Sequence, residues 1–336
     1  MKKILLFLLA LLIGTALFSW TIHSIGGWAS FLKIFSLFTG LSGLFILIIT
    51  FLEMFVGVWK WQTILKSQGS NIRFRDLAGG YFGDFFLTYL VPTIFFAGET
   101  FRGYLVKKKD QSLSWEKTLS SIILDRLIDS SIILIAVVAG VLYFLYNIGL
   151  PPKNLSIFFG IILFLFIGAI TIFYLKCFKK ESIIKSILNI FGFKELKESN
   201  IVLGIEKEIF SFFHNRKYFS EVILMSVLRN ILLLLRQWLL VLFLGGSIGL
   251  FGALSIFGFS YLASLPPIPA NLGSYDAIQS FVFMSLKMPI NMGTVFSMII
   301  RAAEIVMCLV GAVALFRFGY KIVRLKLNGD EEDKQY

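Results

Sequence analysis

Residues 119–146 read LSSIILDRLIDSSIILIAVVAGVLYFLY, a long apolar run with three charged side chains near its beginning. The run is longer than the roughly 20 residues that an α-helix needs to cross a bilayer. A soluble protein would instead place its apolar residues at helical or strand spacing around a core. We therefore interpret this segment as a transmembrane helix.

The composition of the whole chain agrees with this interpretation. Of its 336 residues, 57% are apolar and 15% are charged, and the mean hydropathy is +0.83, values outside the usual range of soluble domains. The net charge of +12 would suggest nucleic acid in a soluble protein, but here the basic residues gather between apolar runs. We therefore assign them to membrane topology and anionic lipid headgroups, and expect no nucleic-acid partner.

Six segments are long enough to span a membrane, and the first is expected to be retained as a helix rather than cleaved. They are residues 4–22, 34–58, 119–146, 155–176, 219–245 and 293–320.

Two more apolar segments, 77–99 and 252–277, are interrupted by proline and glycine. The breaks fall at Pro92, Gly98, Pro266, Pro267, Pro269 and Gly273. Because irregular backbone at membrane depth needs cover from protein or water, we expect two re-entrant hairpins of half-helices. The predicted fold is an all-α polytopic membrane protein.

The positions of lysine and arginine predict the orientation. With the N-terminus in the cytoplasm, 23 of the 32 basic residues fall in cytoplasmic segments and only three in outside loops. This asymmetry follows the positive-inside rule. We expect a protein of the cell membrane with both termini in the cytoplasm.

The order of the elements predicts an inverted repeat within one transmembrane domain, residues 1–326. Residues 34–146 would form the first repeat and 219–320 the second, because each contains a span, a broken hairpin and a returning span. The alternative is that the broken segments are only kinked structural helices. Residues 177–218 are expected to form a cytoplasmic amphipathic connector, on the inner leaflet or free of it, and 327–336 a disordered acidic tail.

Charged residues inside spans are costly unless paired or hydrated, so each is a candidate for function. Asp125 and Asp129 lie one helical turn apart, with Arg126 between them. They could form a latch or headgroup contact, or interhelical salt bridges. Arg229 and Arg236 lie two turns apart on one face and could escort an anion or pair statically with Glu53, Asp84 or Glu99.

Arg301 and Glu304 have the spacing of a pair within one helix, which favours a structural role. Glu99 and Arg102 lie where the first hairpin returns to the cytoplasm. The two histidines are isolated in the sequence, and we expect neither a metal nor a cofactor.

Three motifs, VPTIFFAGETFRGYLVKK (91–108), LDRLIDSS (124–131) and LPPIPANLGSYDA (265–277), together with Arg301, carry a family resemblance. They resemble the flippase-like membrane domain of lysylphosphatidylglycerol synthases and their stand-alone relatives. The matching positions are Gly98, Glu99, Arg102, Asp125, Arg126, Asp129, Pro266, Pro269, Gly273 and Asp276.

The resemblance implies lipid translocation. Phe95 and Phe96 depart from the small and basic residues usual there, and Asp125 and Asp276 stand where Glu is commoner, which leaves the headgroup open. The synthases also carry an aminoacyl-transferase domain, which is not expected here because the sequence stops soon after the final span. The resemblance therefore implies a transporter rather than an enzyme.

Three functions remain open at this stage. The first is a translocase for an anionic or modified phospholipid or a polyprenyl-phosphate-linked lipid. The second is an integral-membrane enzyme that acts on a lipid phosphate through Glu99, Asp125 and Asp129, although no recognised catalytic spacing is present. The third is a non-transporting subunit that docks a lipid-synthesising enzyme.

Overall fold

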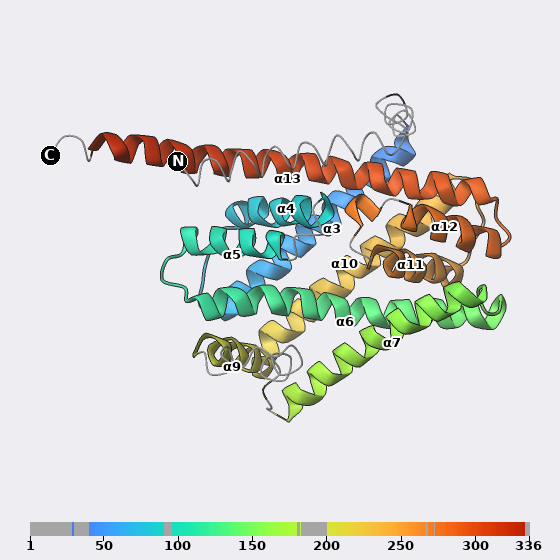
Figure 1. The fold of residues 1–336 in the computed structure, drawn as a ribbon, viewed down its shortest axis with the longest axis horizontal. Coiled ribbons are helices and arrows are strands. Elements are labelled where there is room, and N and C mark those ends of the chain that lie inside the picture. The colour runs from blue at the N-terminus through green and yellow to red at the C-terminus, as the bar shows by residue number, and fades with distance from the viewer. Residues whose placement is uncertain are drawn as a thin grey trace.

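The computed structural model describes residues 40–90, 96–179, 200–265, 268–271 and 273–332, together with positions 29 and 182. Within these residues every regular element is a helix. In Figure 1 the long helices α6 (Trp115–Asn147) and α13 (Ile290–Glu332) lie on opposite sides of a crossing pair, α3 (Leu41–Ser67) and α10 (Arg216–Phe243).

Five of the described helices are long and apolar enough to cross a membrane: α3, α6, α10, the N-terminal part of α13 (Met292–Phe318), and α7 (Lys153–Phe178) over residues 153–177. These match five of the six expected spans. The sixth, residues 4–22, lies outside the described residues. The expected end of the second span at residue 58 is wrong, because α3 continues to Ser67 with Lys60 and Trp61 fully buried.

The first broken segment consists of two short helices, α4 (Phe74–Leu90) and α5 (Ala97–Lys109), which pack against each other. Helix α4 ends before Pro92, as expected where a proline disfavours the helical conformation of the residue before it. Residues 91–95 lie outside the described part. Gly98 is buried against Asp84 of α4, where a Cβ atom would collide, so glycine permits the close approach of the two helices.

The second broken segment has the same construction. Helix α11 (Leu250–Ser264) ends before Pro266 and Pro267, which are not among the described residues, and a short turn (Pro269–Asn271) leads to α12 (Ser274–Ser285). Gly273 has a φ of 77°, a conformation that favours glycine. Its N–H donates to the Asp276 carboxylate at 3.2 Å, which caps α12.

The helices of the two broken segments pack across the molecule. Helix α11 lies along α6, α4 lies along α13, and α3 lies along α10. Glycines at two of these contacts bring backbones together: a Cβ at Gly140 of α6 would meet the Leu254 backbone, and one at Gly311 of α13 would meet the Phe82 backbone. Small residues of this kind are typical of close helix packing in membranes.

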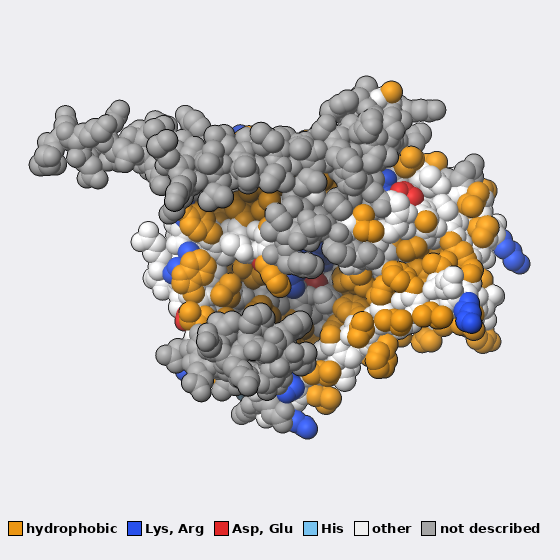
Figure 2. All heavy atoms as spheres, in the orientation of Figure 1, with side chains coloured by type: hydrophobic (Ala, Val, Ile, Leu, Met, Phe, Trp, Pro, Cys, Tyr) orange, Lys and Arg blue, Asp and Glu red, His pale blue; other side chains and the backbone are white. Residues whose placement is uncertain are grey.

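Helix α7 has little contact with the bundle, and in Figure 1 it leaves the end of α6 obliquely. Large apolar side chains such as Ile157, Ile161, Phe164 and Leu165 are exposed on it. In Figure 2, hydrophobic side chains cover the part of the molecule that α7 occupies. This surface is suited to contact with lipid chains.

Part of the expected connector forms α9 (Asn200–His214). Its residues Ile205, Ile209 and Phe212 are buried in a cluster with Leu124 and Ile128 of α6. The apolar face of α9 therefore packs on protein. Most of the connector before it lies outside the described residues. Helical backbone of α13 extends to Glu332, over part of the tail expected to be disordered.

Candidate functional site

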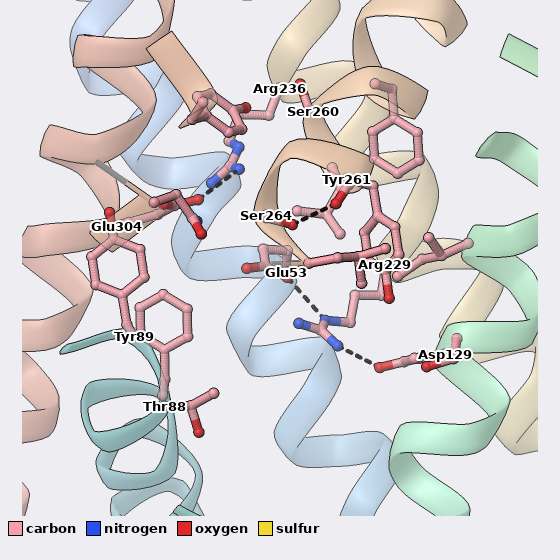
Figure 3. Close-up of a pocket in the computed structure, with 18 of the residues that line it drawn as sticks. Glu53, Thr88, Tyr89, Asp129, Arg229, Arg236, Ser260, Tyr261, Ser264 and Glu304 are labelled. Atoms are coloured by element: carbon pink, nitrogen blue, oxygen red, sulfur yellow. Dashed lines mark hydrogen bonds and ion pairs between the residues drawn. The ribbon is translucent and has the colours of Figure 1, made fainter. Parts of the chain in front are cut away.

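A cavity of about 480 Å³ lies where the two broken segments meet the long helices. Figure 3 shows acidic, basic and aromatic side chains converging on it from α3, α4, α6, α10, α11 and α13. Its charged lining residues are Glu53, Asp84, Arg126, Asp129, Arg229, Arg236 and Glu304. Charges of both signs in a hollow between apolar helices could hold a polar headgroup beside lipid chains.

Beside the cavity, Lys60 joins the two aspartates of α6. Its Nζ atom lies 2.9 Å from Asp125 Oδ1 and 2.6 Å from Asp129 Oδ1. It also donates to the Asp125 backbone carbonyl at 2.8 Å. The lysine side chain is fully buried, so these oxygens replace water around its ammonium group. The two carboxylates share one face of α6, as their spacing predicts.

Arg102 forms a second buried junction. Its guanidinium donates to Asp84 at 3.2 Å and to Asp125 at 2.9 Å, and its central carbon lies 4.0 Å from the centre of the Trp61 ring. Two carboxylates and an aromatic face surround the charge. Arg102 thus ties α5 to α4, α6 and α3.

Arg126 is the most exposed arginine of this group, with 44% of its side chain accessible. It contacts Asp84 at 2.7 Å and Glu99 at 3.3 Å. The pair with Glu99 is the looser of the two, and 25% of the Glu99 side chain is accessible. Arg126 and Glu99 are therefore the members of this network best placed to exchange a protein partner for a ligand.

Arg229 lies between α3 and α6. It donates to Glu53 at 2.9 Å and also pairs with Asp129, which in turn accepts a hydrogen bond from Ser226 at 2.7 Å. Both contacts of Arg229 are drawn in Figure 3. The static pairing with Glu53 that the sequence allowed is therefore present.

The other end of the site contains two simpler pairs. Arg236 lies 3.3 Å from Glu304 and 3.4 Å from the Thr50 hydroxyl. Arg301 lies 2.7 Å from Asp276 and donates to the Ala270 carbonyl at 3.3 Å. The expected pair between Arg301 and Glu304 within α13 is wrong, because each has a partner on another helix.

A chain of neutral polar groups accompanies these two pairs. Ser260 of α11 donates to the Gln237 side chain at 3.1 Å and accepts from the Gln279 amide at 2.5 Å. All three side chains are buried. This end of the site therefore combines two ion pairs with a chain of neutral hydrogen bonds, whereas the other end is held mainly by ion pairs.

The structure separates the candidates identified from the sequence into two groups. Arg126, Asp129, Arg229 and Arg236 line the cavity. Glu99, Arg102, Asp125, Asp276 and Arg301 do not line it, but each forms an ion pair around it. All nine therefore belong to one site region, although only four face the hollow directly.

Sequence reasoning did not single out Lys60, whose side chain connects both aspartates of α6. It was assigned to the cytoplasmic loop after a span ending at residue 58. The absence of Gly or Pro between residues 58 and 68 was the available signal, since nothing there would stop the helix. Asp84 and Glu304 were noted only as possible partners.

The family model that matches this chain is described as lysylphosphatidylglycerol synthase TM region, and the match covers residues 7–312. The chain is 26% identical to UPF0104 membrane protein PH1989 of Pyrococcus horikoshii over 247 residues, 68% of this chain and 73% of that protein. It is 23% identical to UPF0104 membrane protein MJ1595 of Methanocaldococcus jannaschii over 268 residues, 76% of this chain and 78% of that protein.

No solved structure matches the chain significantly. The family match extends over nearly all of the five membrane-spanning helices, both pairs of short helices and the charged residues around the cavity. The protein is thus a multi-pass membrane protein that belongs to the lysylphosphatidylglycerol synthase TM region family.

Proposed function

We propose that this protein moves a lipid with an anionic headgroup, such as a modified phospholipid or a polyprenyl-phosphate-linked lipid, between the two leaflets of the cell membrane. The observation that carries this proposal is the cavity lined by Arg126, Arg229 and Arg236 at the junction of two interrupted helical segments. Such junctions hold the substrate sites of transporters built from inverted repeats. The protein acts as a transporter rather than an enzyme.

The spacing of the helices supports an inverted repeat. Helices α3, α4, α5 and α6 begin at residues 41, 74, 97 and 115, and α10, α11, α12 and α13 begin at residues 216, 250, 274 and 290. Each helix of the second set thus begins 175–177 residues after its counterpart.

The two sets also pack on each other in equivalent ways: α4 of the first set lies along α13 of the second, and α11 of the second lies along α6 of the first. Helices α3 and α10 are antiparallel, since Glu53 contacts Arg229 while Thr50 contacts Arg236. Opposite directions for the counterpart helices are what an inverted repeat requires. In this arrangement the two pairs of short helices are re-entrant hairpins that enter from opposite sides.

The distribution of basic residues supports cytoplasmic termini. The connection between α5 and α6 follows three lysines, Lys107, Lys108 and Lys109, and lies at one end of the molecule in Figure 1. The turns between α6 and α7 and between α12 and α13 lie at the opposite end. In these turns the basic residues are Lys153 at the start of α7 and Lys287. The lysine-rich end is the cytoplasmic one by the positive-inside rule.

Leaflet exchange in liposomes tests the proposal. The purified protein is reconstituted with fluorescent phosphatidylglycerol, phosphatidic acid, phosphatidylethanolamine or polyprenyl phosphate, and outer-leaflet probe is quenched chemically. We expect faster exchange of at least one anionic lipid with the wild type. We expect about tenfold slower exchange with Glu99→Gln and Arg126→Gln, because a charge-assisted contact contributes about 1.5–3 kcal/mol.

Arg73→Gln is the matched control. It removes the same charge from an exposed side chain whose partner is Asp76 at the surface, so exchange should remain at the wild-type rate. If no anionic lipid is exchanged by the folded wild-type protein, the translocase proposal fails. Turnover of a labelled lipid phosphate would then favour the enzyme, and stoichiometric purification with a lipid-synthesising partner would favour the subunit.

A further inference from the structure

Lys60 and Arg236 occupy equivalent places in the two sets of helices. Each lies seven residues after a member of the Glu53–Arg229 pair, on α3 and α10 respectively. Lys60 contacts Asp129 of α6, and Arg236 contacts Glu304 of the counterpart helix α13. The two cations therefore face the same kind of partner in the two halves.

The acids themselves are also equivalent. Asp129 follows Arg126 by three residues, and Glu304 follows Arg301 by three. Arg126 pairs with Glu99 at the start of α5, and Arg301 pairs with Asp276 at the start of α12. The ion pairs of the second half thus join the counterparts of the helices that are joined in the first half, and the paired residues follow the same order along the chain.

The second carboxylate beside the cation is missing from the second half. Lys60 has Asp125 as a second acidic partner, 2.9 Å away, and Asp125 immediately precedes Arg126. The residue that immediately precedes Arg301 is Ile300, a buried apolar side chain. Among the described residues, Arg236 consequently has a single acidic partner, Glu304.

The hydrogen bonding of Arg236 reflects this deficit. Its side chain is 4% exposed, its contacts to Glu304 and Thr50 are long at 3.3 and 3.4 Å, and its Nε–H has no acceptor within the described part of the chain. A buried guanidinium normally has its donors satisfied. Because Arg236 lines the cavity, a molecule in it can approach the guanidinium and accept from the Nη groups, whose contacts with the protein are long.

Two other arginines of the site, Arg229 and Arg102, are not available in this way. Arg229 is held by Glu53 and Asp129. Arg102 also has an Nε–H without an acceptor, but its guanidinium lies against Trp61 and two carboxylates and does not line the cavity. Among the described residues that line the cavity, Arg236 is therefore the buried arginine that has an N–H group without an acceptor.

We infer that Arg236 binds a phosphate oxygen of the lipid headgroup from the cavity side, and that this oxyanion has the role of second acidic partner that the Asp125 carboxylate has for Lys60 in the other half. This inference rests on the proposed lipid translocation and adds to it the headgroup chemistry and the residue that recognises it. The Gln237–Ser260–Gln279 chain leaves this half with fewer fixed charges, so an added oxyanion meets less competition there.

Binding to the full chain in detergent tests the inference independently of transport. The unfolding temperature is followed during titration with dioctanoyl phosphatidic acid, dioctanoyl phosphatidylglycerol, dioctanoylglycerol and inorganic phosphate. We expect the two phospholipids to raise the unfolding temperature of the wild type and dioctanoylglycerol to leave it unchanged. Arg236→Gln should weaken phospholipid binding about tenfold or more, since it removes a charge-assisted contact.

Ile300→Asp gives the sharper comparison. It supplies the missing carboxylate within the protein, so it should satisfy Arg236 and weaken phospholipid binding about tenfold. Ile300→Asn is the matched control of the same size, and should bind more tightly than Ile300→Asp. If either variant does not fold, Arg236→Lys replaces the pair: it keeps the charge but loses the forked donors, and should fall between wild type and Arg236→Gln.

Equal binding of phospholipid by wild type, Arg236→Gln and Ile300→Asp would overturn the inference, as would stabilisation by inorganic phosphate without stabilisation by the phospholipids. The failures of the two proposals are distinguishable. If phospholipid binding depends on Arg236 but no lipid is exchanged between leaflets, only the translocation proposal is contradicted. If lipid is exchanged but Arg236→Gln binds phospholipid as tightly as the wild type, only the headgroup site is contradicted.

Discussion

At the scale of single residues, the site consists of charges that hold each other in place. Lys60, Arg102 and Asp125 are almost completely buried, and each contacts at least two groups of opposite charge. Such pairs seldom add net stability compared with apolar residues, but removal of one member leaves an uncompensated charge. These three residues therefore position the cavity lining, while the partly exposed Arg126 and Glu99 can change partners.

Replacement of Asp125 tests this distinction. We expect Asp125→Asn to lower the free energy of unfolding by about 3–5 kcal/mol, because Lys60 and Arg102 each lose a buried partner. Denaturant unfolding in detergent measures the change. Asp76→Asn is the control: Asp76 pairs at the surface with Lys109, and the expected loss is below about 1 kcal/mol. Equal losses in the two variants would contradict the positioning role of Asp125.

The ion-pair partners of the charged residues could be predicted from the sequence only in part. The spacing of Asp125 and Asp129 was enough to place them on one face, and Lys60 confirms it. Spacing could not reveal that Arg301 and Glu304 turn to different helices, because that choice depends on which neighbours pack against α13. Partners separated by many residues, such as Lys60 and Asp129, follow only from tertiary packing.

At the scale of elements, the contacts between α6 and α11 and between α13 and α4 depend on backbone proximity. Gly140 and Gly311 lie at these contacts and leave no room for a Cβ atom. Long apolar runs predicted five of the helices, and proline and glycine predicted the two interruptions. The sequence did not indicate that the first short helix of each pair, α4 or α11, would pack on a long helix of the other set.

A pair of glycine substitutions measures the importance of this close packing. Gly140→Ala should lower stability by about 1–3 kcal/mol, because the new methyl group would push α11 away from α6. Gly168→Ala on the outer helix α7 meets no atom of the described residues and should be neutral or slightly stabilising, since alanine favours helix. Thermal unfolding of both variants in the same detergent gives the comparison. A neutral Gly140→Ala would contradict the tight contact.

At the scale of the whole molecule, hydropathy and charge alone predicted an all-helical membrane protein, and the helices and the family match confirm this. The site was harder to predict, because its residues come from several long and short helices that are distant in sequence. The motifs around Glu99, Asp125 and Asp276 identified the region, while the cavity itself depends on how the two sets of helices meet.

Cysteine labelling tests the proposed orientation. In a background without Cys177 and Cys308, Gln111→Cys in the α5–α6 connection should react with an impermeant maleimide only in inside-out vesicles. Asn154→Cys, at the start of α7, should react only in right-side-out vesicles. Both side chains are exposed. Reaction of the two cysteines from the same side would contradict the assignment of the lysine-rich end to the cytoplasm.

The Glu53–Arg229 contact has a mechanical consequence. In the proposed inverted repeat, Glu53 on α3 and Arg229 on α10 are counterparts of each other, and they touch at 2.9 Å. Two residues that a two-fold axis relates to each other can touch only close to that axis. If the proposed translocation proceeds by rocking of one half against the other, displacement is smallest at this contact and grows with distance from it. In that cycle the central salt bridge can stay intact while the outlying pairs open and close.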